Sequence, residues 1–239
     1  MDKYIWKKID KKWGKFLLSN NFYIKDCPPD GNCQFRSIEN VLQSLSHIEL
    51  RSLVSDYILK LNDEEFKIIL SDYIIEKKSG QFYGNWNPSK IKTKKQLAHE
   101  INKLGFNFEG DNITLSILSK VLNVEIIIMN EPNSIIRIGE NKRLFIILNF
   151  IKMGNTGHYI SVGYKFNNNI YTIFDKNNIN YELRSLINRK LLLYRHIIYS
   201  VYEKGLDLEE YLSSIQKILG KFSNEDIYII NKIIEKITI

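Results

Sequence analysis

The sequence runs Pro28-Pro29-Asp30-Gly31-Asn32-Cys33-Gln34-Phe35-Arg36-Ser37 over residues 28–37, and this stretch decides how the chain is interpreted. The two prolines favour an extended approach and cannot lie inside a helix. The next two residues, Asp and Gly, are typical of a tight turn, and Asn32 is a candidate N-cap. Apolar residues then recur at helical spacing, namely Phe35, Ile38, Val41, Leu42 and Leu45. The stretch therefore predicts a loop and then a buried helix that begins at about Cys33.

A cysteine at the start of a helix has a chemistry that a cysteine elsewhere lacks. The free N–H groups and the positive end of the helix dipole favour the thiolate form of Cys33 over the thiol. The same N–H groups can stabilise the oxyanion that forms when a thiolate attacks a carbonyl. A single cysteine is more often a small buried apolar residue than a nucleophile, so its position alone leaves both interpretations open.

His158 is the best candidate for the base that such a nucleophile requires. It follows a glycine-containing connection at 150–157 and begins a predicted strand, which would hold its ring on a rigid frame. The remaining histidines lie on or beside predicted helices; they are His47, His99 and His196. A histidine at the start of a strand is often only structural, so the evidence for His158 depends on the Cys33 motif.

The run Asp-Gly-Asn-Cys-x-Phe-Arg-Ser at 30–37 resembles the nucleophile motif of the ovarian tumour (OTU) family of cysteine deubiquitinases. A shorter match at His158 and the layout between Asp26 and Asp175 extend the resemblance. It implies a papain-like α+β fold, with a small central β-sheet flanked by helices. It also implies that Cys33 attacks the isopeptide bond at the C-terminus of ubiquitin or a ubiquitin-like modifier, with His158 as acid and base and a thioester as intermediate.

The same resemblance implies roles for the residues around this pair. The family pattern counts Asp30 with the site, and the backbone of Asp30, Gly31 and Asn32 is expected to hold the oxyanion together with the Cys33 N–H. In many members an Asn or Asp two residues after the histidine orients its ring, but here that position is Ile160. Apart from Asp30 itself, the candidate orienting residues are Asp26, Asn155 and Asp175. A catalytic dyad, or a weakened site that only binds ubiquitin, is the alternative.

A loop at 79–94 carries three aromatic residues, Phe82, Tyr83 and Trp86. Loop aromatics often bind partners, but they can equally hold the loop on the core. Because the resemblance places a substrate-facing segment here, Tyr83 and Trp86 are expected to contact ubiquitin.

The chain is predicted to have three parts. In residues 1–21, tryptophan and isoleucine alternate with lysine, which predicts a basic amphipathic helix packed on the core. Residues 22–178 form the predicted OTU protease domain. Residues 179–239 form a predicted helical extension, with helices expected at 180–203, 206–219 and 224–237.

Composition narrows the remaining function classes. The chain has 239 residues and a net charge of +7, but its lysines are scattered, so a nucleic-acid or membrane-binding protein is only a third hypothesis. No apolar run approaches the roughly 20 residues of a membrane span. The two cysteines exclude a disulfide framework and favour an intracellular, cytoplasmic location.

Two further expectations come from what the sequence contains and lacks. It has no Cys-x-x-Cys and no histidine pair at ligand spacing, so neither a metal site nor a cofactor is expected. The abundant Lys, Ile and Asn favour an AT-rich genome, such as that of a large DNA virus or an intracellular bacterium.

Overall fold

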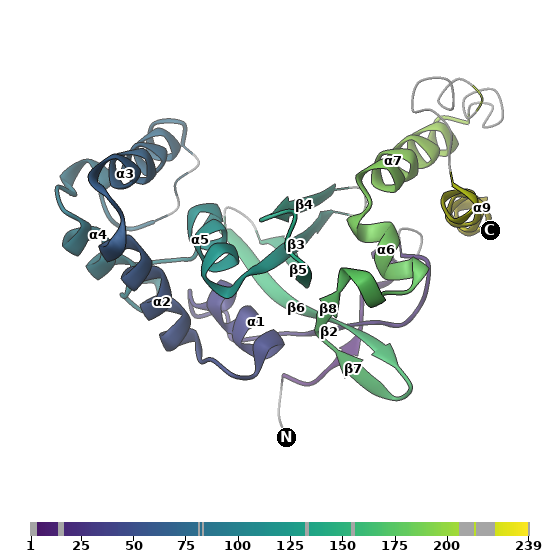
Figure 1. Cartoon of the computed structure of the whole chain (residues 1–239), viewed down its shortest axis with the longest axis horizontal. Coiled ribbons are helices and arrows are strands. Elements are labelled where there is room, and N and C mark those ends of the chain that lie inside the picture. The colour runs from purple at the N-terminus through teal and green to yellow at the C-terminus, as the bar shows by residue number, and fades with distance from the viewer. Residues whose placement is uncertain are drawn as a thin grey trace.

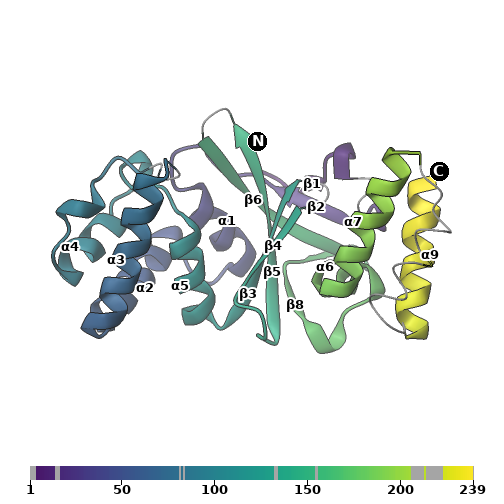
Figure 2. The ribbon, with the colours of Figure 1, turned by 90° about the horizontal axis from the view of Figure 1, so that it is seen from above.

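The computed structural model describes residues 4–13, 17–80, 82, 84–131, 134–153, 156–205, 213 and 223–238. Figures 1 and 2 show a central sheet with helices on both sides. The helices α1–α5 cover one face, and α6, α7 and α9 lie on the other (Figure 2). The helices are α1 (Cys33–Leu42), α2 (His47–Lys60), α3 (Asp63–Lys78), α4 (Lys94–Ile101), α5 (Asn112–Leu122), α6 (Tyr181–Ile187), α7 (Arg189–Glu203) and α9 (Asn224–Thr238).

The sheet has the strand order β1-β2-β6-β5-β3-β4, with β7 paired to β6 and β8 paired to β5. Only β3 and β5 pair in parallel among the described strands. The strands are β1 (Lys7–Lys8), β2 (Phe22–Lys25), β3 (Val124–Glu131), β4 (Ser134–Ile138), β5 (Leu144–Met153), β6 (Thr156–Phe166), β7 (Asn169–Tyr171) and β8 (Ile173–Asp175).

The central strands are apolar on both faces because both faces are covered. Successive residues of β3 belong to two different cores: Ile126 and Ile128 pack with helices α1–α5, whereas Ile127 packs with the N-terminal segment and α6. All three are at most 2% exposed. The prediction of an α+β fold with a helix-flanked central sheet is confirmed.

In its described residues, 4–13 and 17–21, the N-terminal segment does not form the amphipathic helix predicted for residues 1–21. In its described part, β1 pairs antiparallel with β2, and Lys11–Trp13 forms a single 3-10 turn. The Ile9 N–H donates to the carbonyl of Phe22 at 3.1 Å, which continues this pairing. Trp13 is fully buried against the sheet, so the segment does pack on the core. Pairing with the sheet edge overrides the helical period of the sequence.

The C-terminal region also differs in detail. The single helix predicted at 180–203 is divided at Asn188 into α6 and α7, and the Asn188 side chain accepts the Leu191 N–H at 3.2 Å. Leu183 and Leu186 of α6 pack in the same core as Trp13 and Ile127, on the α6 side of the sheet. This core therefore continues past residue 178. The helix predicted at 206–219 lies outside the described residues apart from position 213. The domain boundaries therefore stay predictions.

Candidate active site

The loop before α1 is held by the Asp30 carboxylate. One carboxylate oxygen accepts the Asn32 N–H at 3.0 Å, and the other accepts Nε and Nη2 of Arg36 at 3.1 and 2.9 Å. Burial opposes ionisation of Asp30, but these hydrogen bonds outweigh it and hold the pKa of its carboxyl below the usual range. Asp30 thus shapes the loop, and its oxygens point toward the loop and α1.

Gly31 is required by its conformation and by its neighbour. Its φ of +79° lies in the left-handed region, and an added Cβ would lie 2.4 Å from the carbonyl carbon of Gly105. The turn therefore packs directly on the backbone of the segment 105–106. This contact fixes the start of α1, and with it the Cα of Cys33.

Asn32 occupies the N-cap position, but its side chain makes no capping hydrogen bond, contrary to the sequence-based expectation. Its oxygen instead accepts Nη2 of Arg51 and the N–H of Gly105, each at 2.9 Å. Arg51 is 1% exposed, and its guanidinium lies 4.2 Å from the centre of the Phe35 ring. This buried arginine ties the loop to α2. Sequence reasoning missed it because nothing local distinguishes it from a surface arginine.

His158 approaches this loop from β6. It is 7% exposed, and its Nε2 lies 2.7 Å from Oδ1 of Asp26. The hydrogen bond with Cys33 is the largest influence on His158; burial opposes it and Asp26 adds to it, and together they raise the pKa of the imidazole to about 9. The structure thus brings Cys33, His158 and Asp26 together, and Nδ1 is the ring nitrogen left to face the sulfur.

Asp26 is positioned by the chain on either side of it. It directly follows β2, whose last residue, Lys25, is paired with Ser161 of β6. Its Oδ1 also accepts the N–H of Cys27 at 2.8 Å, which fixes the carboxylate against its own backbone. Asp26 is therefore the aspartate that can orient the imidazole of His158.

The other candidate orienting residues do not reach His158 or lie outside the description. Asp175 is paired with Leu144 at one end of β5, whereas His158 is paired with Ile151, seven residues further along. At about 3.3 Å per residue, this spacing corresponds to roughly 23 Å. The Asp175 carboxylate instead binds Arg143 at 2.6 and 2.8 Å. Asn155 lies outside the described residues.

Ile160 occupies the position where many family members have an Asn or Asp. It is 4% exposed and packs in the core on the α6 side of the sheet. It offers no hydrogen-bond acceptor from its side chain. The candidate orienting group, Asp26, instead directly follows the neighbouring strand β2, far earlier in the chain.

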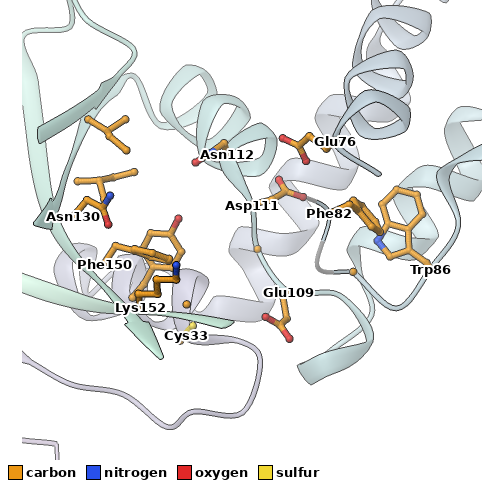
Figure 3. A pocket seen from close by; sticks show the side chains of 16 residues that line it. Cys33, Glu76, Phe82, Trp86, Glu109, Asp111, Asn112, Asn130, Phe150 and Lys152 are labelled. Atoms are coloured by element: carbon orange, nitrogen blue, oxygen red, sulfur yellow. The ribbon is translucent and has the colours of Figure 1, made fainter. Parts of the chain in front are cut away.

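A cavity of about 440 Å³ opens beside Cys33. Figure 3 shows the strand side of this cavity with Asn130, Phe150 and Lys152, and carboxyl groups across from it. Those carboxyls belong to Glu76, Glu109 and Asp111, and burial raises the pKa of each. The cavity thus has carboxyl groups on one side, and the candidate nucleophile Cys33 is among its lining residues.

The loop aromatics are partly accounted for. Trp86 lines the cavity but is only 8% exposed, because its ring packs against Tyr73, Phe82 and Phe108 at centroid distances of 5.1, 5.2 and 6.0 Å. Trp86 therefore holds the loop on the core, and a contact with substrate through its exposed edge stays a prediction. Tyr83 lies outside the described residues.

Asp26, Cys27 and His158 place three potential metal-ligand atoms within 4.8 Å of one another. Burial raises the pKa of the Cys27 thiol to about 12, and its sulfur lies 3.5 Å from the carbonyl oxygen of Tyr159. A neutral thiol that donates to a carbonyl is a poor metal ligand. The placement of Asp26 beside His158 is therefore better suited to orienting the imidazole than to binding a metal.

The family model described as "OTU-like cysteine protease" matches residues 28–159, which is more than half of the chain. No curated protein sequence matches the chain. An ovarian tumour (OTU) domain solved in complex with ubiquitin is 23% identical, with a TM-score of 0.49, over 73% of this chain and 86% of that one.

Two further solved structures are similar at lower identity. An OTU deubiquitinase from Wolbachia pipientis wMel is 14% identical, with a TM-score of 0.39, over 70% of this chain and 97% of that one. The Hazara virus OTU bound to ubiquitin is 14% identical, with a TM-score of 0.37, over 69% and 98%. The match of the family model over residues 28–159 shows that the chain belongs to the OTU-like cysteine protease family.

Proposed function

We propose that the protein is a deubiquitinase that hydrolyses isopeptide bonds at the C-terminus of ubiquitin or a ubiquitin-like modifier. The observation that carries this proposal is the placement of His158 between Cys33 and Asp26. A cysteine protease needs a thiolate, a proton carrier and a group that orients the carrier, and these residues supply all three. The choice of ubiquitin rests on the OTU-like motif around Cys33.

The raised pKa of His158 determines its charge before the reaction begins. With a pKa of about 9, the imidazole is protonated at neutral pH, and the charged ring stabilises a thiolate on Cys33. The sulfur attacks the carbonyl carbon, and the carbonyl electron pair moves to oxygen. When the C–N bond breaks, His158 gives its proton to the leaving amine and a thioester forms. His158 then takes a proton from water, whose hydroxide attacks the thioester and releases the Cys33 thiolate.

The oxyanion requires N–H donors that are not already hydrogen-bonded to another protein group. The sequence-based expectation included the Asn32 N–H among these donors. In the structure this N–H is bonded to the Asp30 carboxylate, so it is not free to bind the oxyanion. Among the described residues, the N–H groups of Gly31 and Cys33 have no protein acceptor. We propose that these two donors hold the oxyanion at the start of α1, where the helix dipole adds to them.

The cavity beside Cys33 suits the acyl side of the substrate. Cys33 lines it, so a chain lying in it could present its last carbonyl to the Cys33 sulfur. Its carboxyl groups would attract a basic side chain of that tail. Because burial raises the pKa of Glu109, a cationic partner would also relieve the cost of ionising this residue.

Labelling with ubiquitin that carries a C-terminal electrophile tests the proposal. The wild-type protein should form a covalent adduct, and Cys33→Ala should form none. Cys27→Ala is the matched control and should still be labelled, because the Cys27 thiol is buried and bonded to carbonyls. Ubiquitin binding without labelling or hydrolysis would instead support a module that has lost activity.

We further propose that the protein acts in the cytoplasm. If it comes from a virus or an intracellular bacterium, this would be the cytoplasm of the host cell. The two free cysteines favour a reducing compartment, and the abundance of Lys, Ile and Asn favours a source with an AT-rich genome. None of the described helices is long and apolar enough to cross a membrane. Fractionation of infected cells, with the protein found outside the cytosol, would contradict this location.

A further inference from the structure

A second, smaller hollow begins at Asp26. It has a volume of about 170 Å³ and is formed by Tyr4, by residues 25–28 at and after the end of β2, and by one side of α1. Arg36 and Glu39 contribute from the helix. None of these residues lines the larger cavity beside Cys33. Half of the residues that line the hollow, Tyr4 and residues 25–27, precede the part of the chain that the family model matches, which begins at residue 28.

The catalytic residues connect the two hollows, because Cys33 lines the larger cavity and Asp26 lines the smaller one. His158 lies between these two residues: its Nε2 lies 2.7 Å from Oδ1 of Asp26, and Cys33 is its other hydrogen-bond partner. An acyl tail in the larger cavity must therefore have its leaving amine on the His158 side. The four-carbon stem of the acceptor lysine carries the leaving chain beyond His158, toward the hollow.

Three of the four charged residues that line the hollow have a hydrogen-bonded side-chain partner among the described residues. Arg36 is bonded to Asp30, Glu39 lies 2.9 Å from Nδ1 of His47, and Asp26 is bonded to His158. Among the described residues, Lys25 has no charged partner, although it is only partly exposed. A ligand that enters this hollow would therefore meet the ammonium group of Lys25, which forms no ion pair with any carboxylate of the described residues.

We propose that this hollow is the subsite for the leaving chain, and that it takes an acidic side chain next to the acceptor lysine, with Lys25 as the residue that selects it. The inference rests on the proposed isopeptidase function. It assigns the end of β2 a role in choosing the substrate, in addition to its pairing with β6.

Two defined substrates test the inference. In each, ubiquitin is joined through its C-terminal glycine to a lysine of a short peptide, and the residues flanking that lysine are glutamate in one and lysine in the other. The wild-type protein should cleave the glutamate substrate with a kcat/KM about two- to fivefold higher, as expected for one partly exposed ion pair. Lys25→Glu should reverse this preference, and Lys25→Met should remove it.

Lys8→Glu is the matched control, because Lys8 is exposed on β1 and does not line the hollow. It should keep the wild-type preference. In 1 M salt the wild-type preference should shrink toward one, since exposed ion pairs are screened, and this measurement does not depend on any variant folding.

The electrophile-labelling assay separates this inference from the proposed function, because that probe has no leaving polypeptide. Loss of labelling in the wild-type protein would overturn both. Normal labelling with equal cleavage of the two peptide substrates, or a preference that Lys25→Glu leaves unchanged, would overturn the subsite alone.

Discussion

The two walls of the active site are built in different ways. The wall that carries Cys33 comes from one continuous stretch, 30–36, which is closed on itself by the hydrogen bonds of Asp30. The wall that carries His158 joins two positions 132 residues apart, and the pairing of β2 with β6 aligns them. The nucleophile is thus set by local turn geometry, whereas the base is set by the register of the sheet.

This difference predicts that the largest effect comes from the long-range contact. Asp26→Ala should lower kcat by roughly 10²- to 10⁴-fold, because His158 loses the group that fixes its ring. Asp26→Asn should retain most of the activity, since the amide oxygen can still accept from Nε2. Hydrolysis of a fluorogenic ubiquitin substrate measures both. Asp175→Ala should match the wild type because, among the described residues, the Asp175 carboxylate binds Arg143 and the Asn177 N–H, far from His158.

In the wall that carries Cys33, a substitution should instead lower the stability of the fold through backbone strain. Gly31→Ala places a Cβ 2.4 Å from Gly105 and should destabilise the fold by more than the roughly 1–2 kcal/mol of a left-handed non-glycine residue. Gly80→Ala is the control for strain alone, because Gly80 has a φ of +75° and open space around its Cβ position. Urea unfolding compares the two. Equal losses would show that the contact with Gly105 does not constrain the loop.

The His158 wall should also make stability depend on pH. The pKa of His158 is raised from 6.5 to about 9, so the protonated ring is stabilised in the folded state. Its contribution is fully present below pH 6.5 and is lost as the pH rises through about 9. Thermal unfolding across this range should show the loss in the wild type. His158→Gln should show a flatter profile, and parallel profiles would contradict the assignment.

The smallest effect should come from the cavity wall. Glu109→Gln removes one carboxylate from the acidic side and should raise KM for the fluorogenic substrate by about two- to fivefold, with kcat nearly unchanged. Glu64→Gln, on the exposed part of α3 outside the cavity, should leave both constants as they are. A fall in kcat for Glu109→Gln would instead mean that this residue acts on the chemical step.

The same contrast explains what the sequence could predict. The loop and the start of α1 at Cys33 were predicted because turn residues and helical spacing are local signals. The choice among Asp26, Asn155 and Asp175 could not be made, since it depends on which strands pair and in which register. The N-terminal segment was wrongly predicted as a helix for the same reason. The hydrogen bond from buried Arg51 to the Asn32 side chain could not be predicted either, because no spacing pattern in the sequence indicates it.

The central claim is that His158 is held between Cys33 and Asp26, and an NMR titration of the His158 ring tests it most directly. In the wild-type protein the ring should titrate with a pKa of about 9. Cys33→Ala and Asp26→Ala should each lower that value, with the larger change for Cys33→Ala. A wild-type value near 6.5 that neither substitution changes would contradict the account.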